Sequence, residues 1–261
     1  MRISFASVLA LCAFSSALAA GPAAQPAVDS CKSHFVGGVA PRPSPALQQT
    51  ALRALCSSGY AALHSGRTRG PLYSAEHLTR DRVVAARRLA RTNSFRADHR
   101  LPPAERAELV DYARSGFDRG HIAPNGDMPD ADTQAESFLL SNMVPQDPAS
   151  NRHLWSDIEA AARAMVVREG EAYVVTGPAY FGKGRWLNGR VAVPDYLWKA
   201  IYLPRTNQAA AWIAPNSGER RYEVISLNQL QSAVGIDVFP TLPTHVKERA
   251  SAILRPYTRS R

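Results

Sequence analysis

The segment Phe117-Asp118-Arg119-Gly120-His121-Ile122-Ala123-Pro124 places an acid, an arginine, a glycine and a histidine at four consecutive positions near the middle of the chain. Because the unperturbed pKa of histidine lies close to neutral pH, His121 is a candidate general base. The next stretch, Ala123-Pro124-Asn125-Gly126, favours a turn. We therefore expect a short strand that ends near His121 and a turn directly after it.

A second segment, Ser141-Asn142-Met143-Val144-Pro145-Gln146, follows about twenty residues later and leads into an amphipathic run from Ser150 to Glu169. Asn151 lies at the start of the helix that we expect there. Glu159 follows about 80° further round an ideal helix and about 12 Å further along it. The apolar residues at helical spacing are Leu154, Ile158, Ala161 and Met165.

These two segments suit phosphodiester hydrolysis, which needs a base for the attacking water and positive charge for the phosphate. Mg²⁺ prefers oxygen ligands and keeps several waters, so one side-chain amide oxygen can be its protein ligand. Asn151 offers such an oxygen. Glu159 is too far along the helix to coordinate the same ion directly, so we expect it to act through a bound water.

In this order and at this spacing, the residues resemble the DNA/RNA non-specific endonucleases, the sugar-non-specific nucleases with a ββα-metal active site. The resemblance covers roughly residues 70 to 235. It implies that His121 is the general base, that Asn151 binds Mg²⁺ directly, with Mn²⁺ as an alternative, and that Glu159 holds metal-bound water. The residues that carry the resemblance are Asp118-Arg119-Gly120-His121, Ala123-Pro124, Ser141-Asn142, Pro145-Gln146, Asn151, Trp155 and Glu159.

The same resemblance extends to residues around the base. It implies that Asn142 positions the site and that Arg119 supports the phosphate or the shape of the site. It also implies an arginine upstream of the motif, for which we favour Arg91 because the stretch from Arg91 to Asp98 resembles that part of the family. Asp118 is expected to contribute geometry rather than chemistry. The competing upstream arginines are Arg87, Arg88 and Arg96.

The composition is that of a globular protein, because 45% of the 261 residues are hydrophobic and 20% are charged. The formal net charge of +9 favours an acidic partner such as nucleic acid. A basic secreted protein without such a partner, or a genome biased towards arginine, gives the same excess. We expect DNA and RNA as substrates and no association with a membrane.

The amino terminus has the pattern of a secretory signal peptide, with Arg2, an apolar run and Ala17-Leu18-Ala19 before a cleavage site. Cys12 leaves a lipoprotein as a minor alternative. Cleavage leaves Cys31 and Cys56, an even pair that predicts a disulfide in an oxidising compartment. We expect a signal peptide at 1–20, an extension with the disulfide at 21–69, a nuclease domain at 70–261 and a periplasmic or secreted location.

The pattern of elements predicts an α+β fold, with helices packed on a mainly antiparallel sheet that carries a ββα-metal motif. Helices are also expected at Ala46–Cys56, Leu227–Val234 and His245–Leu254. The expected strands are Leu72–Leu78, Val83–Leu89, Ala172–Thr176, Arg190–Val193, Tyr196–Leu203, Ala209–Ala214 and Glu223–Ser226.

The sequence thus predicts a metal-dependent non-specific endonuclease. Two alternatives stay open. The first is a catalytically weak nucleic-acid-binding protein of the same fold. The second is a phosphodiesterase that acts on another phosphate ester, such as a lipid or a small nucleotide.

Overall fold

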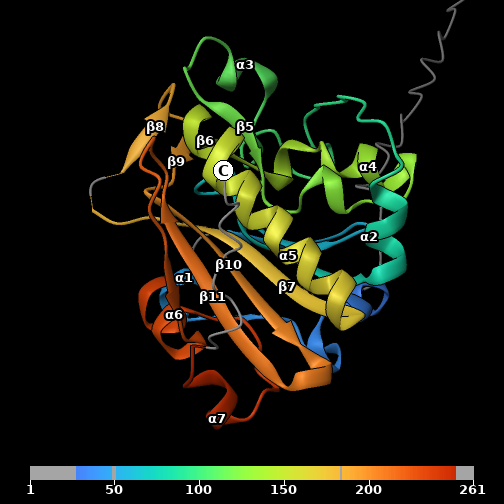
Figure 1. The fold of residues 1–261 in the computed structure, drawn as a ribbon. Coiled ribbons are helices and arrows are strands. Elements are labelled where there is room, and N and C mark those ends of the chain that lie inside the picture. Colours follow the sequence, from blue (N-terminus) through green and yellow to red (C-terminus); the bar gives the residue numbers. More distant parts are fainter. Residues whose placement is uncertain (1–27, 49–50, 183, 251–261) are drawn as a thin grey trace, which may run out of the picture.

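A seven-stranded antiparallel sheet forms the centre of the molecule, in the order β12-β11-β10-β7-β4-β3-β2 (Figure 1). The computed structural model describes residues 28–48, 51–182 and 184–250, so the expected signal peptide at 1–20, with Cys12, lies outside the described residues. The α+β fold class with a mainly antiparallel sheet is confirmed. The seven strands are β2 (Leu52–Cys56), β3 (Ala61–Ser65), β4 (Gly70–Thr79), β7 (Glu171–Ala179), β10 (Tyr196–Leu203), β11 (Gln208–Pro215) and β12 (Glu223–Ile225).

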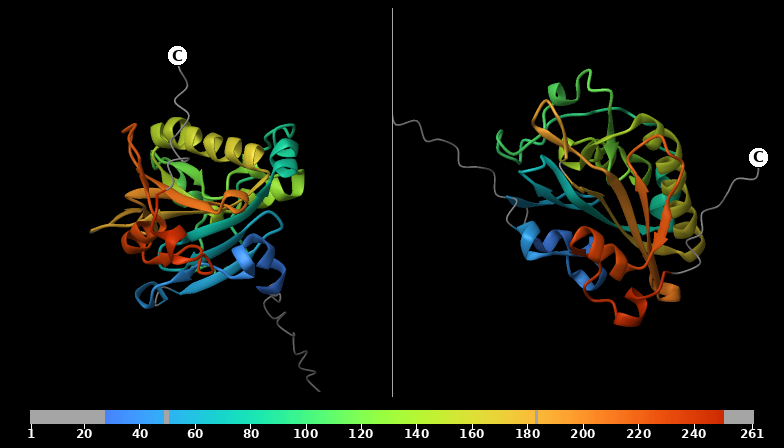
Figure 2. Two further views of the ribbon diagram at one scale, coloured as in Figure 1. Left: turned by 60° about the horizontal axis from the view of Figure 1, so that its bottom comes forward. Right: turned by 90° about the vertical axis from the view of Figure 1, so that its left-hand side faces the viewer.

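Helices cover both faces of the sheet, and each face has its own hydrophobic core (Figure 2). Helix α5 packs Ile158 and Val166 onto one face. Helices α6 and α7 pack Leu230 and Val246 onto the other. No helix in the described residues combines the length and the apolar character needed to cross a bilayer. The α-helices are α1 (Pro45–Gln48), α2 (Arg80–Ala86), α3 (Leu109–Tyr112), α4 (Ala131–Ser137), α5 (Ser156–Glu169), α6 (Leu227–Val234) and α7 (Thr244–Lys247).

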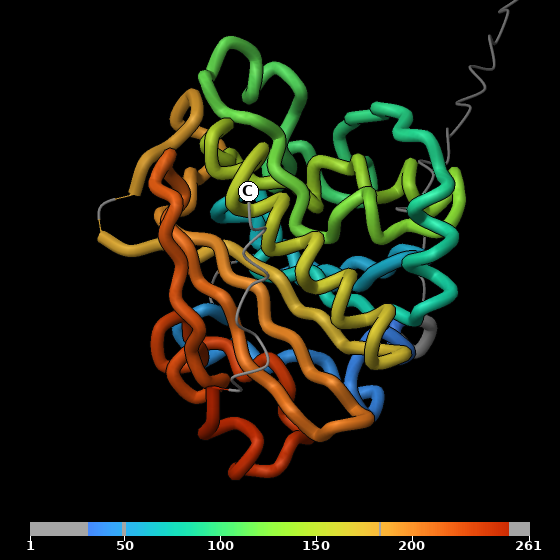
Figure 3. Tube along the Cα trace, in the orientation of Figure 1, coloured from blue at the N-terminus to red at the C-terminus, as the bar shows by residue number. Residues whose placement is uncertain are grey.

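Shorter elements complete the fold and form most of the layer around β5 and β6. Figure 3 follows the chain from α2 through a long connection to α3 and then into β5, on the same side of the sheet as α5. Three two-stranded ribbons are β1 (Arg42–Pro43) with β13 (Ile236–Asp237), β5 (Asp118–His121) with β6 (Met143–Gln146), and β8 (Arg185–Leu187) with β9 (Val191–Val193). The remaining helical turns are η1 (Val28–His34), η2 (Val36–Gly38), η3 (Asn125–Asp127), η4 (Leu140–Asn142), η5 (Ser150–Trp155) and η6 (Pro204–Thr206).

Most expected elements are present, with shifts at their ends, but the predicted strand at Val83–Leu89 is wrong. Residues Arg80–Ala86 form α2 instead. The side chain of Thr79 accepts a hydrogen bond from the backbone N–H of Arg82 at 3.3 Å, which caps the helix start. Val83 and Ala86 are buried three positions apart, as on one face of a helix. The adjacent apolar residues Val83 and Val84 suggested a strand, but a short apolar run fits a buried helix as well as a strand.

The predicted helix at Ala46–Cys56 is also wrong over most of its length. It is replaced by α1 (Pro45–Gln48) and β2 (Leu52–Cys56), with residues 49–50 outside the description. Residues 52–56 form a strand rather than a helix because they pair with β3 at the edge of the sheet, where Leu55 is buried. The helix expected at His245–Leu254 is short: α7 ends at Lys247, and residues after 250 are not described.

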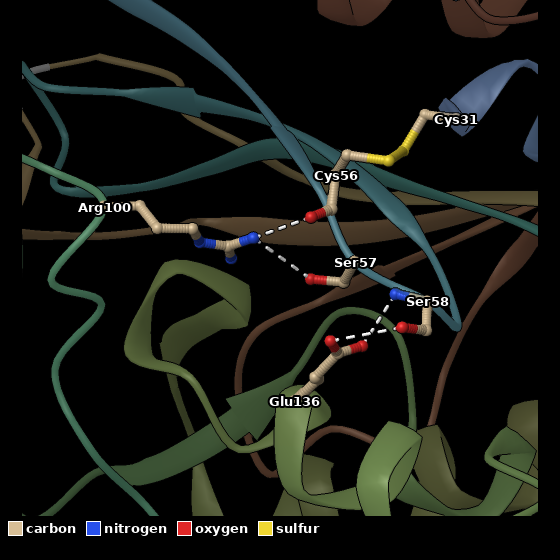
Figure 4. The surroundings of a disulfide bond; sticks show 6 residues. All are labelled: Cys31, Cys56, Ser57, Ser58, Arg100 and Glu136. Carbon is tan, nitrogen blue, oxygen red and sulfur yellow. Dashed lines mark hydrogen bonds between the residues drawn. A yellow bond between two sulfur atoms is a disulfide. The ribbon is translucent and has the colours of Figure 1, made fainter. Parts of the chain in front are cut away.

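The predicted disulfide is present between Cys31 of η1 and Cys56 at the end of β2, with Cα atoms 5.7 Å apart (Figure 4). Next to it, the Arg100 guanidinium donates to the carbonyl oxygen of Cys56 at 2.7 Å. The backbone N–H of Ser58 donates to a Glu136 carboxylate oxygen at 2.7 Å. The disulfide region is therefore tied to α4 on one side and to η1 on the other.

We expected the nuclease domain to begin at residue 70, after an extension with the disulfide at 21–69. In the structure, β2 and β3 come from before residue 70 and are already strands of the central sheet. These strands carry few long apolar side chains, and β3 contains His64 and Ser65, so the sequence pattern does not mark them as sheet.

Candidate active site

The two segments that the sequence singles out form one antiparallel ribbon. Strand β5 pairs with β6 so that His121 lies opposite Met143 and Asp118 opposite Gln146. A Cβ atom on Gly120 would lie 2.5 Å from the Cβ of Gln146, closer than real Cβ contacts, so the motif requires glycine at this position. The short strand ending at His121 is confirmed.

The side chain of Asn142 connects the segment that follows His121 to the central sheet through hydrogen bonds. Its side-chain oxygen accepts hydrogen bonds from the Ser74 hydroxyl at 2.8 Å and from the Ala123 N–H at 2.9 Å. Its amide nitrogen donates to the carbonyl oxygens of Ala123 and Ser137, both at 2.9 Å. The buried side chain therefore has all of its hydrogen-bond donors and acceptors satisfied by protein atoms, which suits a residue that positions the site.

His121 is buried beside two aromatic rings, and its side chain is only 8% exposed. The imidazole meets the Phe138 ring edge to face at 4.8 Å and lies 5.7 Å from the Phe95 ring. Burial, and then the positive charge of Arg91, lower the pKa of His121 to about 3. The ring is thus neutral near pH 7, and its buried Nε2 atom has no hydrogen-bond partner among the described residues. An unpaired ring nitrogen can accept a proton.

Asp118 organises the start of the long helix. The amide nitrogen of Asn151 donates to its Oδ2 atom at 2.9 Å, and Arg152 forms two hydrogen bonds with the same carboxylate, at 2.7 and 2.9 Å. Burial acts to raise the pKa of Asp118, but the bonds from Arg152 and Asn151 outweigh it, so the pKa is lowered. With its nitrogen held, Asn151 leaves its side-chain oxygen without a protein partner in the described part of the chain.

The expected single helix from Ser150 to Glu169 consists of two parts. Ser150–Trp155 is a π-helix, η5, and Ser156–Glu169 is α5. The wider π turns change the angular step, so the 80° between Asn151 and Glu159 in an ideal α-helix does not apply. Trp155 is buried in the core.

A cavity of about 540 Å³ opens beside the ribbon and is strongly basic. Asp118 is the only carboxylate among its described lining residues, and Arg152 neutralises it. The Arg119 guanidinium lies 4.2 Å from the centre of the Phe95 ring. Neither His121 nor Glu159 lines this cavity. The lining residues are Arg91, Asn93, Phe95, Tyr112, Ala113, Arg114, Phe117, Asp118, Arg119, Asn151 and Arg152.

Of the four upstream arginines, the favoured Arg91 is the one that lines the cavity. It donates to the side-chain oxygen of Asn125 at 2.8 Å, and its charge contributes to the lowered pKa of His121. Arg96 donates to backbone carbonyl oxygens instead. Arg87 and Arg88 are exposed just after α2.

Glu159 lies deeper, on α5, within a cluster of charges. Arg163 is 4.0 Å from its carboxylate and pairs with Asp127 at 3.0 Å. Burial raises the pKa of Glu159 to about 7, although the charges of Arg163 and Lys199 act in the opposite direction. The carboxyl therefore titrates near neutral pH.

Sequence reasoning missed three contributors to this geometry. Arg163 is four residues after Glu159 on one helix, a spacing that could have suggested a pair. Lys199 is 1% exposed within the apolar strand β10 and donates to Thr176 at 2.7 Å, and a lysine in such a strand was a readable signal. The contact of Asp118 with Asn151 joins positions 33 apart, and nothing in the sequence announces it.

Comparison with known proteins identifies the chain. A family model for DNA/RNA non-specific endonucleases matches residues 41–245. The chain belongs to this family, and it is an enzyme of the nuclease class.

Members of the DNA/RNA non-specific endonuclease family include similar proteins from distant organisms. The chain is 35% identical to Nuclease C1 of Cunninghamella echinulata var. echinulata, over 60% of this chain and 69% of that protein. It is 30% identical to the human protein "Nuclease EXOG, mitochondrial", over 74% of this chain but only 58% of the relative. A crystal structure of the EndoG/EndoGI complex shares the fold, with a TM-score of 0.67 and 24% identity over 86% of this chain and 96% of the other.

Endonucleases of this family are metal-dependent, and the residues here fit a hard divalent cation with one protein ligand. The described residues contain no cluster of three or more His, Cys, Asp or Glu side chains that could hold a metal. The free side-chain oxygen of Asn151, oriented by Asp118, is instead a suitable donor for Mg²⁺. The remaining ligand positions would be filled by water and phosphate oxygens.

Proposed function

We propose that this chain is a secreted or periplasmic endonuclease that uses Mg²⁺, or alternatively Mn²⁺, to hydrolyse phosphodiester bonds of DNA and RNA without sequence preference. The observation that carries the proposal is the arrangement around Asp118, which holds the nitrogen of Asn151 and leaves its side-chain oxygen without a partner among the described residues. This oxygen belongs to a basic cavity, and the neutral His121 is buried next to that cavity's lining residues Arg91 and Phe95.

In this proposal His121 acts as the general base. Its unpaired Nε2 atom takes a proton from water as the water oxygen bonds to phosphorus. The bond from phosphorus to the 3′ oxygen then breaks, and this oxygen takes a proton from solvent water, leaving a 5′-phosphate and a 3′-hydroxyl, as the family resemblance implies. Because burial and the charge of Arg91 lower the pKa of His121, the ring is neutral and its Nε2 lone pair is unprotonated throughout the neutral range.

Arg91 and Arg119 are proposed to hold the phosphate under attack. Both line the cavity, and guanidinium groups form paired hydrogen bonds with phosphate oxygens. Mg²⁺ held through Asn151 would add positive charge where negative charge builds up on the phosphate. Such contacts are made to the sugar-phosphate backbone of the nucleic acid and do not depend on the base sequence, which accounts for non-specific cutting.

Export of the chain is proposed from its amino-terminal pattern and supported by the Cys31–Cys56 disulfide, since disulfides persist in oxidising compartments. Several relatives are named mitochondrial nucleases, which is a property of those proteins. Amino-terminal sequencing of the protein recovered from periplasm or medium tests the proposal. A start near residue 20 supports export, and an intact Met1 contradicts it.

The decisive activity test is plasmid cleavage with Mg²⁺ in the presence and absence of a chelator. We expect fragmentation only with the free metal. His121→Ala should lower the rate by at least about 10²-fold, as is typical for the loss of a general base. His99→Ala, at an exposed position outside the site, is the matched control.

Other results would favour the alternatives. An intact plasmid that is nevertheless bound with and without chelator would indicate a nucleic-acid-binding protein. Hydrolysis of lipid or small nucleotide esters without cleavage of plasmid would indicate a different phosphodiesterase. Near-normal cleavage by His121→Ala would remove His121 from the role of base.

A further inference from the structure

The turn between α3 and β5 holds an arginine in a backbone conformation that favours glycine. Arg114 has a φ of 57°, in the left-handed region, and Gly116 two residues later has a φ of 79°. A residue with a Cβ atom is strained in this region, and such strain often occurs at functional sites. Arg114 is exposed and lines the basic cavity. The turn therefore presents a long cationic side chain at a position where glycine would be less strained.

Arg114 also differs from the other arginines of the cavity in having no partner. Across the described part of the chain it has no hydrogen bond, ion pair or ring contact. Its guanidinium group keeps all of its donors available. The other three are each held by a neighbour: Arg91 by Asn125, Arg119 by the Phe95 ring, and Arg152 by Asp118.

The charge of the cavity exceeds what a single phosphate needs. Arg152 and Asp118 cancel each other, which leaves Arg91, Arg119 and Arg114. Arg91 and Arg119 are the two assigned to the phosphate under attack. On a nucleic acid strand the phosphates are spaced about 3.4 Å apart along the helix axis, so a second phosphate is always close to the first.

We propose that Arg114 binds the backbone phosphate next to the one that is cleaved. This inference rests on the proposed function, because only a polymer of phosphodiesters presents that neighbouring phosphate. A lipid head group or a mononucleotide ester has no phosphodiester at this distance. Arg114 would then contribute to substrate affinity and to a preference for chains over short esters, and its removal would leave the chemistry at the cleaved bond unchanged.

The test is DNA binding by Arg114→Gly, measured in chelator so that nothing is cleaved. A short duplex is titrated at several NaCl concentrations. We expect the dissociation constant to rise about threefold to tenfold at low salt. The slope of log K against log salt should fall in magnitude by about 0.9, the value for one lost phosphate contact. Because glycine relieves the strained φ, the variant should fold, and its melting curve verifies this.

Two matched variants separate a specific contact from a general effect of charge. Arg114→Lys keeps the charge and should keep most of the salt slope. Arg42→Ala removes an exposed arginine from β1, which pairs with β13, and Ile236 of β13 belongs to the core on the other side of the sheet. This variant should leave binding at the cavity unchanged. An equal loss of slope in Arg42→Ala, or in Arg114→Lys, would overturn the assignment.

The cleavage kinetics give a second readout. With Mg²⁺, Arg114→Gly should raise KM for long DNA by a similar factor while kcat changes less than twofold. A variant with wild-type KM and salt slope would sink the inference and leave the proposed function standing. Failure of the wild-type chain to bind or cleave DNA at all would sink the proposed function itself.

Discussion

Asp118 is a residue whose two oxygens orient two different neighbours, Asn151 and Arg152. If its main task is to turn the amide of Asn151, then Asp118→Ala should allow that amide to rotate and weaken the metal site. We expect a Mg²⁺ requirement raised about tenfold or more, as for other residues that orient a metal ligand. At saturating Mg²⁺ the rate should largely recover. Cleavage rates across a Mg²⁺ titration measure both quantities.

Arg152→Ala is the control for this prediction. It removes the ion pair with Asp118 but leaves the hydrogen bond between Asp118 and Asn151 in place. Its Mg²⁺ requirement should therefore stay much closer to that of the wild type. Equal effects of the two substitutions would mean that the ion pair matters and the orientation of Asn151 does not.

The pH dependence of the rate is expected to come from Glu159. Burial raises the pKa of its carboxyl to about 7, so the proton is bound below that pH and the carboxylate is lost as pH falls. The pKa of His121, about 3, lies too low to contribute between pH 5 and 8. We expect kcat/KM to fall about tenfold per pH unit below 7. Glu159→Gln should be slow and independent of pH over this range, and a retained acid limb would exclude Glu159 as its source.

At the scale of elements, the sequence predicts those helices and strands that are determined by apolar spacing and turn residues within the element itself. The strand ending at His121, the strands β4, β7 and β10, and helix α6 are all readable from apolar spacing and turn residues. Arg91 could be named because the stretch from Arg91 to Asp98 resembles the family, and Asn151 because it starts the expected helix, and the structure places both at one cavity.

The elements that could not be predicted depend on distant partners. Strand β2 exists because it pairs with β3 at the edge of the sheet. The π turns of η5 place Asn151 within reach of Asp118, a contact between residues 33 apart. π turns have no simple sequence pattern, and they occur often at functional sites. The segments proposed to form the active site were thus recognisable, whereas the contacts that orient them were not.

In the whole molecule, the candidate active site and the Cys31–Cys56 disulfide lie on opposite sides of the central sheet. The cavity and the β5–β6 ribbon lie on the side of the sheet covered by α5, whereas Cys31 belongs to the core on the other side. The formal net charge of the chain is +9, and the arginines that line the cavity concentrate positive charge at the candidate site. Changes at the disulfide should affect stability more than catalysis.

Removing the disulfide tests this separation. The bond closes a loop with a sequence separation of 25 residues, for which loop entropy predicts a stabilisation of about 3 kcal/mol. For a chain of this size that corresponds to a melting temperature lowered by about 6 to 12 °C in the Cys31→Ser/Cys56→Ser double variant. Below its melting transition the variant should keep kcat and KM, because none of the residues drawn around the disulfide in Figure 4 lines the cavity. Calorimetry with and without reductant measures the shift, and reductant should lower the wild type to the level of the variant. A double variant that melts with the wild type would show that the bond adds no stability. One that loses activity while folded would show that the two sides of the sheet are coupled.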